Sequence, residues 1–379
     1  MAKFRGITWD HPRGANALRA AAKRSYSGRD EPLIEWDVQP LEGFESHPIS
    51  DLCSRYDLVV MDHPHTGEAL ASNCLQSLEQ IFDAETLGKI SAATIGSCFQ
   101  SYNMADKHWA LPLDAATQVM ACRDDLLKQD IPRTWNEVVA LSEKTGQVAM
   151  SWAGPHAFLS FLSIAHALDQ SLDLRNSETW ISKEVSKEAY EFLDRLHANS
   201  PISTSKLNPI GLLDYMAANK EVSLCPLIYG YVNYSAPFTV NKISFHNAPV
   251  KTLGGRSGSI LGGTGIAISK RCRVNDELKE HLLWLMKPET QRVFIPDHDG
   301  QPSNRAAWRD DAVNDRWGEF YNRTFNTVQT ASIRPRHDGY ITFQGEASAY
   351  LRKAIEQKVA PDKATSHLQK MFDNSRNPL

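Results

Sequence analysis

Two short segments combine an acid, an imidazole and a proline in the same order. Asp10-His11-Pro12 follows the apolar run at residues 4–9, and Asp62-His63-Pro64-His65 follows the apolar run "DLVVM" at residues 57–61. An imidazole held by a carboxylate can transfer protons near neutral pH, and the same groups can hydrogen-bond a ligand. We therefore consider His11, His63, Asp10 and Asp62 as candidate catalytic or ligand-binding residues.

Three roles are possible for the residues of these segments: helix capping, acid–base catalysis and metal binding. An Asp before a proline turn can simply cap a helix. General acid–base catalysis would need a cross-strand pair, Asp10 with His63 or Asp62 with His11, because neighbours on a strand point to opposite faces. A metal site could use His11, His63 and His65, but the chain lacks the H-x₃₋₅-H and CxxC spacings typical of zinc ligands, so we expect no metal.

The surrounding pattern indicates strands and helices in alternation. Residues 4–9, "LIEWDVQPL" and "DLVVM" have the character of strands, and "PISDLCSRY" indicates a helix that Ser50 could cap. This alternation predicts βαβ units with a mainly parallel sheet. In such a sheet, ligands bind beyond the carboxyl ends of the strands, which is where both Asp-His-Pro segments are expected.

Length and composition limit the class of protein. A chain of 379 residues is expected to form two lobes, and a net charge of −4 without a basic block argues against nucleic acid as a partner. No apolar stretch is long enough for a membrane span, and residues 1–14 lack the pattern of a secretory signal. The six scattered cysteines favour reduced thiols. These features predict a cytoplasmic protein, or a periplasmic one whose leader was removed.

The order of several motifs resembles the family 1 extracellular solute-binding proteins of ABC importers, the maltose-binding type. The motifs are "YDLVVMD", "NCLQSLEQIF", "HWALPLDAATQVMACRDDLL", "PRTWNEVVALSEK", "LGGTGIAISKRCRVNDELKEHLLWLMKPETQRVF" and "GQPSNRAAW". The resemblance covers nearly the whole chain. It implies an α/β periplasmic-binding-protein type II (Venus-flytrap) fold, in which each lobe is a mainly parallel sheet flanked by helices. The implied lobes are residues 1–115 plus 264–308 and residues 116–263 plus 309–379, with a ligand cleft between them.

The resemblance and the strand-end argument together give a set of candidate ligand-binding residues. Gly262 and Gly263 could offer backbone N–H groups or permit a tight bend, and the aromatic rings of Trp152 and Tyr229 could stack on a sugar or belong to the core. The full set is Trp9, Asp10, His11, Asp62, His63, His65, Asp114, Trp152, Tyr229, Gly262, Gly263, Thr264, Asp297 and His298.

Two functions remain open from the sequence. The first is a monomeric binder of a small polar solute, sugar-like or carboxylate-bearing, with an ABC-importer permease as partner if the protein is exported. The second is a cytoplasmic lyase, dehydratase or hydrolase on the same scaffold, since other proteins of this fold are enzymes. We expect no cofactor, no nucleic acid and no membrane insertion in either case.

Overall fold

The chain folds into two compact units, each assembled from separate stretches of sequence. The computed structural model describes residues 3–24, 31–175 and 180–376. Unit 1 comprises Met1–Ala115, Gly262–Asn314 and Arg336–Asp338. Unit 2 comprises Ala116–Leu261, Asp315–Pro335 and Gly339–Leu379.

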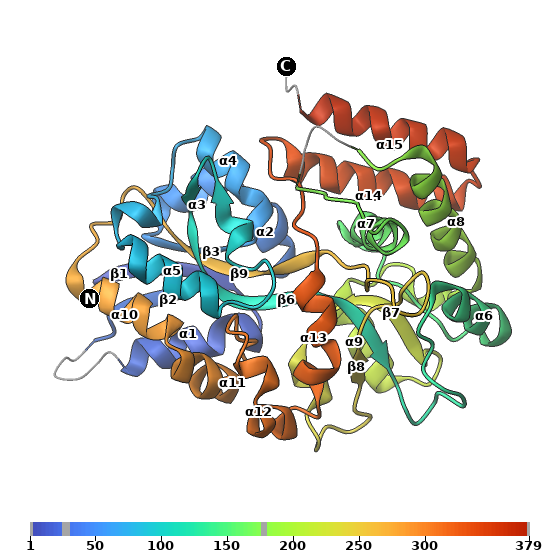
Figure 1. The fold of residues 1–379 in the computed structure, drawn as a ribbon, viewed down its shortest axis with the longest axis horizontal. Helices are drawn as coiled ribbons and strands as arrows, with labels where there is room; N and C mark the ends of the chain where they lie inside the picture. The colour runs from blue at the N-terminus through green and yellow to red at the C-terminus, as the bar shows by residue number, and fades with distance from the viewer. Residues whose placement is uncertain (1–2, 25–30, 176–179, 377–379) are drawn as a thin grey trace. The chain divides into compact units, whose positions relative to one another are not determined.

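Unit 1 is built on a sheet with the strand order β2-β1-β3-β9, followed by the first residues of β6. Strands β2, β1 and β3 are parallel, whereas β9 runs antiparallel to β3. Helices cover the sheet (Figure 1). The elements are β1 Phe4–Trp9, α1 Pro12–Arg24, β2 Ile34–Gln39, α2 Leu41–Ser46, α3 Ile49–Arg55, β3 Leu58–Met61, α4 Thr66–Ala71, α5 Ala84–Ala93, β4 Asn103–Met104, β5 Lys107–His108, β9 Leu261–Ile268, α10 Asp276–Met286, α11 Ile295–Asp297 and α12 Asp311–Arg316.

The sheet of unit 1 is buried on both faces, which explains the continuous apolar runs in its strands. All four residues of β3 are buried. One hydrophobic cluster joins Leu58 and Val60 of β3 to α1, α5 and α10. A second cluster joins Val59 and Met61 to α3 and α4. The alternation along β3 therefore fixes which helices lie on each face.

Unit 2 is largely helical around a small sheet. The second part of β6 pairs antiparallel with β7 and β8. The elements are β6 Ala110–Cys122, which begins in unit 1, α6 Trp135–Thr145, α7 His156–Leu168, α8 Lys183–Asn199, α9 Pro209–Ala218, β7 Leu224–Tyr229, β8 Ser244–His246, α13 Phe320–Thr330, α14 Tyr340–Glu356 and α15 Pro361–Ser375.

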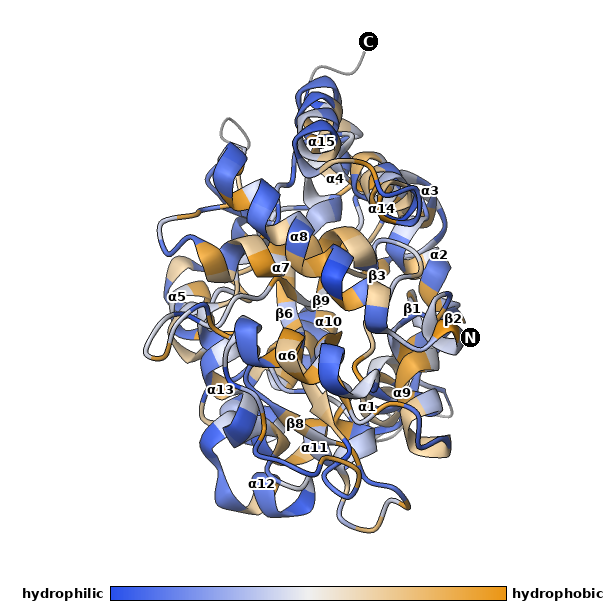
Figure 2. Ribbon diagram, turned by 90° about the vertical axis from the view of Figure 1, so that its right-hand side faces the viewer, coloured by the Kyte–Doolittle hydropathy of each residue, from blue (hydrophilic) through white to orange (hydrophobic). Residues whose placement is uncertain are grey.

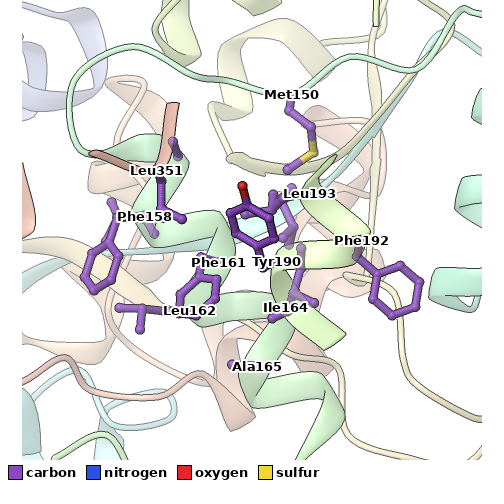
Figure 3. Packing of buried hydrophobic residues seen from close by; sticks show 14 of the residues in the cluster. Met150, Phe158, Phe161, Leu162, Ile164, Ala165, Tyr190, Phe192, Leu193 and Leu351 are labelled. Carbon is purple, nitrogen blue, oxygen red and sulfur yellow. The ribbon is translucent and has the colours of Figure 1, made fainter. Parts of the chain in front are cut away.

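Helix α7 is the centre of the unit 2 core. It is apolar over most of its length (Figure 2), and all of its residues are buried. Figure 3 shows Phe158 and Phe161 of α7 packed near Tyr190 and Leu193 of α8 and Leu351 of α14. A helix that is apolar all round must be enclosed by other elements, and here α8 and α14 contact α7.

The strand directions correct one part of the sequence-based expectation. A mainly parallel sheet is expected in each lobe, but the strand pairs that the structure shows in unit 2 are antiparallel. The parallel pairings there are isolated bridges such as Val148 with Leu224. The sequence pattern could not show this, because a strand buried on both faces is apolar throughout whether it runs parallel or antiparallel to its neighbours.

Two helix boundaries also differ from expectation. Helix α3 begins at Ile49 with Pro48 at the N-cap, so Ser50 lies inside the first turn and does not cap the helix. The segment "NDELKEHLLWLMKPETQRVFI", residues 275–295, has the pattern of a single helix, but α10 ends at Met286 and a π-helical segment Thr290–Phe294 follows. Pro288 explains the break, because proline lacks the N–H that would continue the helix. Within the described residues, we find no helix with the length and apolarity of a membrane span.

Candidate functional site

The two Asp-His-Pro segments follow neighbouring strand ends in unit 1. Strand β1 pairs parallel with β3, with Gly6 opposite Leu58 and Ile7 opposite Val59. Both strands therefore end at the same edge of the sheet, and the residues after Trp9 and Met61 emerge there. Figure 1 shows α1 beginning beyond the end of β1.

The first segment forms a compact aromatic corner at the start of α1. The Trp9 ring is buried and stacks on His11, with 5.1 Å between ring centroids and 7° between ring planes. His11 Nδ1 accepts a hydrogen bond from the Arg13 backbone N–H at 3.1 Å. Burial, and secondarily the Arg13 charge, lower the pKa of His11 to about 4. The imidazole is therefore neutral near pH 7, and the neighbouring Asp10 is exposed.

A buried ion pair lies beside this corner, and the sequence did not reveal it. Arg13 Nε is 3.0 Å from Asp114 Oδ1, and Arg13 Nη2 is 2.6 Å from Asp114 Oδ2. The side chains are 4% and 7% exposed. The guanidinium also lies 5.3 Å from the Trp9 ring centroid. Asp114, predicted as a ligand-binding residue, thus has its carboxylate bonded to Arg13 in a two-point contact.

A signal for this pair was present in the sequence. Asp114 lies within "ALPLDAATQVMAC", whose residues are all buried. A buried carboxylate requires a hydrogen-bonded or charged partner. An aspartate within this mostly apolar segment therefore predicts that a cation elsewhere in the chain pairs with it. Arg13 lies 101 residues earlier, at the start of α1, and the residues around it do not indicate that it is that cation.

The second segment forms a short 3-10 helix, His63–His65, in place of a strand end. Asp62 Oδ1 accepts the His63 backbone N–H at 2.8 Å and lies 3.1 Å from His63 Nδ1. His65 Nδ1 is 3.7 Å from Glu68 Oε2. Both imidazoles are buried, whereas the Asp62 side chain is 19% exposed. The acid–imidazole contact therefore joins sequence neighbours, which a turn allows and a strand does not.

Strand β9 passes beside this segment. Gly265 lies opposite Met61, so the antiparallel register brings Thr264 next to Asp62. Gly263 has a φ of 90°, a conformation that only glycine adopts without strain, and Thr264 is buried. The predicted residues Gly262, Gly263 and Thr264 therefore continue the same sheet edge.

The two residues predicted near the end of α11, Asp297 and His298, lie in different surroundings. His298 Nδ1 contacts the Phe294 carbonyl oxygen at 2.8 Å. Asp297 is exposed and lines a 430 Å³ surface groove with Trp284 of α10. The next acid, Asp299, accepts a hydrogen bond from Asn16 Nδ2 of α1 at 2.7 Å. Sequence reasoning missed this link, since "DHDG" indicates only a turn.

The predicted residues of unit 2 lie around the start of α7. The Trp152 ring is buried and meets His197 edge-on at 5.1 Å. His156, the first residue of α7, meets the Tyr229 ring edge-on at 5.9 Å. Strand β7 ends at Tyr229, and Tyr231 precedes a 3-10 helix, Val232–Ser235.

Metal binding has no geometric support in the described part of the chain. Within residues 3–24, 31–175 and 180–376, no three His, Cys, Asp or Glu side chains lie close enough to hold a metal ion. The arrangement at the unit 1 strand ends is suited to hydrogen bonding instead, because it combines neutral imidazole, carboxylate and backbone groups.

Comparison with known families identifies the class of protein. Residues 52–318 match the model of the bacterial extracellular solute-binding protein family. This match covers more than half of the chain, and the chain belongs to that family. The resemblance stated from the sequence motifs is confirmed, and the family match supports solute binding rather than the enzyme alternative.

Solved structures confirm the type II periplasmic-binding-protein fold. A solute-binding protein of an ABC transporter from Agrobacterium radiobacter K84, in complex with ribitol, has a TM-score of 0.79 at 18% identity, covering 100% of this chain and 99% of that one. Maltose-bound MalE3 of T. maritima has a TM-score of 0.80 at 16% identity, covering 98% and 99%. A solute-binding protein from Agrobacterium vitis S4 with bound D-mannitol has a TM-score of 0.70 at 12% identity, covering 99% and 98%. No curated protein sequence matches the chain.

Proposed function

We propose that this solute-binding protein binds a neutral, hydroxyl-rich solute, a polyol or a sugar, at the sheet edge of unit 1 where β1 and β3 end. The single observation that carries this proposal is that the carboxylates at this edge reach solvent, whereas the nearby arginine is already paired. The carboxylates of Asp10 and Asp62 reach solvent, whereas the nearby cation Arg13 is buried against Asp114. Carboxylates accept hydrogen bonds from hydroxyl groups and repel anions.

This charge pattern favours a polyol or sugar over a carboxylate-bearing solute. A bound carboxylate would need a cation or several N–H donors. Arg13 is paired, and Arg336, a half-buried arginine of unit 1, donates to the carbonyl oxygens of Ser101 and Asn103 at 2.9 and 2.6 Å. His11 is neutral near pH 7 because of its lowered pKa, so it adds no positive charge.

The solved structures give a consistent choice of test compounds. The three proteins described above hold ribitol, maltose and D-mannitol, and a further solute-binding protein, from Thermotoga lettingae TMO, holds alpha-D-tagatose. These compounds share hydroxyl groups and lack a charge, which is the chemistry that exposed carboxylates recognise. For this chain they serve as a panel of candidates.

Calorimetric titration of the full chain tests the proposal. The panel is ribitol, D-mannitol, D-tagatose and maltose, with succinate as a carboxylate of similar size. We expect binding of at least one polyol or sugar and none of succinate. Asp10→Asn and Asp62→Asn should each weaken binding roughly 10- to 100-fold, the value of a hydrogen bond to a charged group.

Asp51→Asn is the matched control for these variants. Asp51 is an exposed acid of α3 in the same unit, bonded to Arg55 at 2.6 Å. Its loss should leave the affinity unchanged. Binding of succinate in preference to every polyol, or unchanged affinity in both strand-end variants, would overturn the proposal.

We propose that the remaining members of the predicted set also contribute to solute binding. Calorimetric titration of single variants tests each of them. They are Trp9, His11, His63, His65, Asp114, Trp152, Tyr229, Gly262, Gly263, Thr264, Asp297 and His298. Tyr229→Phe separates a hydroxyl contact from ring packing, because it retains the ring that meets His156. A loss of affinity in Tyr229→Phe would assign the hydroxyl to the solute.

We further propose an ABC-importer permease as the partner and an extracellular or periplasmic location for the binding step. The family to which the chain belongs is one of extracellular solute-binding proteins. Deleting the gene should abolish high-affinity uptake of the solute that calorimetry identifies, and uptake that persists unchanged would refute this role. Light scattering of the purified chain tests the expected monomer.

A further inference from the structure

Unit 1 contains a cavity that is lined by none of the predicted solute-binding residues. It has a volume of 300 Å³ and lies between the end of α5, the end of α10 and residues 303–304. Its walls are mainly apolar and include Ile90, Ala93, Met286 and Pro288. Sites for small molecules are concave and mostly apolar, and this volume is at the lower end of their usual range. The cavity therefore has the size and character of a site for a small ligand.

Hydrogen bonds hold the polar end of the cavity in place. Gln291 lies in the π-helical segment that follows α10, and such segments are frequent at functional sites. Its Oε1 accepts the backbone N–H groups of Ser303 at 2.8 Å and Asn304 at 3.2 Å. Its Nε2 donates to the Leu285 carbonyl oxygen at 2.9 Å. The Ile95 backbone N–H donates to the Ser303 carbonyl oxygen at 2.8 Å. This end of the cavity is therefore preorganised, which lowers the cost of binding.

One amide group at this end keeps a donor without an acceptor. Asn304 lines the cavity and is 5% exposed. Its Oδ1 accepts the Ala306 backbone N–H at 2.9 Å, which identifies Nδ2 as the other end of the side-chain amide. Nδ2 donates to no group in the described part of the chain. Because an enclosed donor is stabilised by an acceptor, an oxygen atom of a ligand is the natural partner of Nδ2.

The charge at the cavity favours an anionic ligand. Among the described residues that line it, Lys89 is the only charged one. Its Nζ bonds Glu85 one turn earlier on α5 at 2.6 Å, and both side chains are exposed, so this pair is weak. A lysine ammonium has three donors on a flexible stem and can therefore bond a second anion as well. Asn304 Nδ2 and Lys89 Nζ both donate, and a carboxylate accepts from both.

We propose that this cavity is a second ligand site, separate from the solute site, and that it binds a short-chain carboxylate with an apolar tail, such as hexanoate. The tail lies among the four apolar side chains, and the carboxylate accepts hydrogen bonds from Asn304 and Lys89. Burial of the tail supplies most of the affinity, about fourfold for each methylene group.

NMR titration of the full ¹⁵N-labelled chain tests the proposal, with hexanoate, butyrate and hexan-1-ol as probes. The side-chain NH₂ signals of Asn304, identified by their absence from Asn304→Asp, should shift as hexanoate is added. Hexanoate should bind roughly 15-fold more tightly than butyrate, because it buries two more methylene groups. Hexan-1-ol lacks the charge and should bind more weakly than hexanoate.

Three variants locate the site, with binding followed by backbone amide signals. Asn304→Asp retains the oxygen that bonds Ala306 but replaces the donor with a negative charge, and it should lose hexanoate binding. Ala93→Leu fills the cavity and should lose binding as well. Ala92→Leu is the matched control, because Ala92 is the exposed neighbour on α5 and does not line the cavity. It should bind hexanoate like the wild type.

The three probes on the wild-type chain decide the proposal even where a variant fails to fold. Absence of hexanoate binding, or binding of hexan-1-ol as tight as that of hexanoate, would overturn it. Wild-type affinity for hexanoate in both Asn304→Asp and Ala93→Leu would also overturn it, because the ligand would then lie elsewhere.

Discussion

A single buried ion pair holds the first strand end of unit 1. Arg13 and Asp114 are almost completely enclosed, and the guanidinium also covers the Trp9 ring. Removing one partner of a buried pair leaves the other charge without compensation, which is more damaging than removing both. The pair therefore couples the start of α1 to strand β6.

Asp114→Asn should lower the free energy of unfolding by about 3–5 kcal/mol, because Arg13 is left buried without a counter-charge. Urea denaturation measures the change. The control Glu188→Gln breaks the exposed ion pair with Lys251 and should have little effect. Equal effects in the two variants would show that burial of the Arg13–Asp114 pair is energetically unimportant.

Buried histidines make stability depend on pH. His281 of α10 is 8% exposed, and its Nε2 has no hydrogen-bond partner in the described part of the chain. Burial, and then the nearby Arg24, lower its pKa from 6.5 to about 4. Between these two values the unfolded chain binds a proton at this site and the folded chain does not. The contribution of His281 is therefore present above pH 6.5 and is lost as the pH falls toward 4.

His281→Gln should flatten the acid side of the stability profile by about 1.4 kcal/mol per pH unit across this window. Urea denaturation at several pH values gives the slope. His367→Gln removes an exposed imidazole from α15 and should keep the wild-type slope. An unchanged slope in His281→Gln would exclude His281 as a source of the acid sensitivity.

At the scale of elements, α1 lies so close to the end of β1 that position 14 in its first turn has no room for a side chain. A Cβ atom at Gly14 would lie 2.3 Å from Trp9 Nε1. The Trp9 ring is buried against His11 and cannot swing away without disturbing the strand end. Helix and ring therefore define each other's position.

Gly14→Ala should destabilise the protein and weaken solute binding, because the new methyl group displaces the Trp9 ring. Gly88→Ala is the matched control on α5, where nothing lies within 4 Å of the added Cβ. It should stabilise the protein by up to about 1 kcal/mol through helix propensity. Denaturation and calorimetry measure both effects, and wild-type behaviour of Gly14→Ala would contradict the close approach.

The elements differ in how far the sequence predicts them. Strand β1 is predicted at residues 4–9 because its apolar run ends at a proline turn, and β3 is predicted because four apolar residues stand between polar ones. The antiparallel pairing of β6 with β7 and β8 is not predicted, since pairing direction depends on the path of the whole chain. The contact of Arg13 with Asp114 joins residues 101 positions apart, which is too far in the sequence to leave a local pattern.

At the scale of the whole molecule, solute binding should increase the free energy of unfolding. A ligand that binds only the folded chain raises the free energy of unfolding by about 2.7 kcal/mol at 100 times its dissociation constant. A thermal shift screen with the polyol and sugar panel should therefore raise the melting temperature for the true ligand alone. The Asp10→Asn, Asp62→Asn double variant should lose this increase, and an equal increase in the double variant would place the ligand elsewhere.

The discontinuous make-up of the two units has a consequence for the newly synthesised chain. Strand β3 reaches the ribosome exit early, but its partner β9 begins only at Leu261, and unit 1 also takes in Arg336–Asp338. Helices α14 and α15, which pack on α8, lie later still in the sequence. For most of translation, the β3 edge lacks its β9 partner, which is a condition that favours aggregation. Both units therefore need segments from far along the sequence before their sheets and helix layers are complete, and removal of α15 should be tolerated poorly.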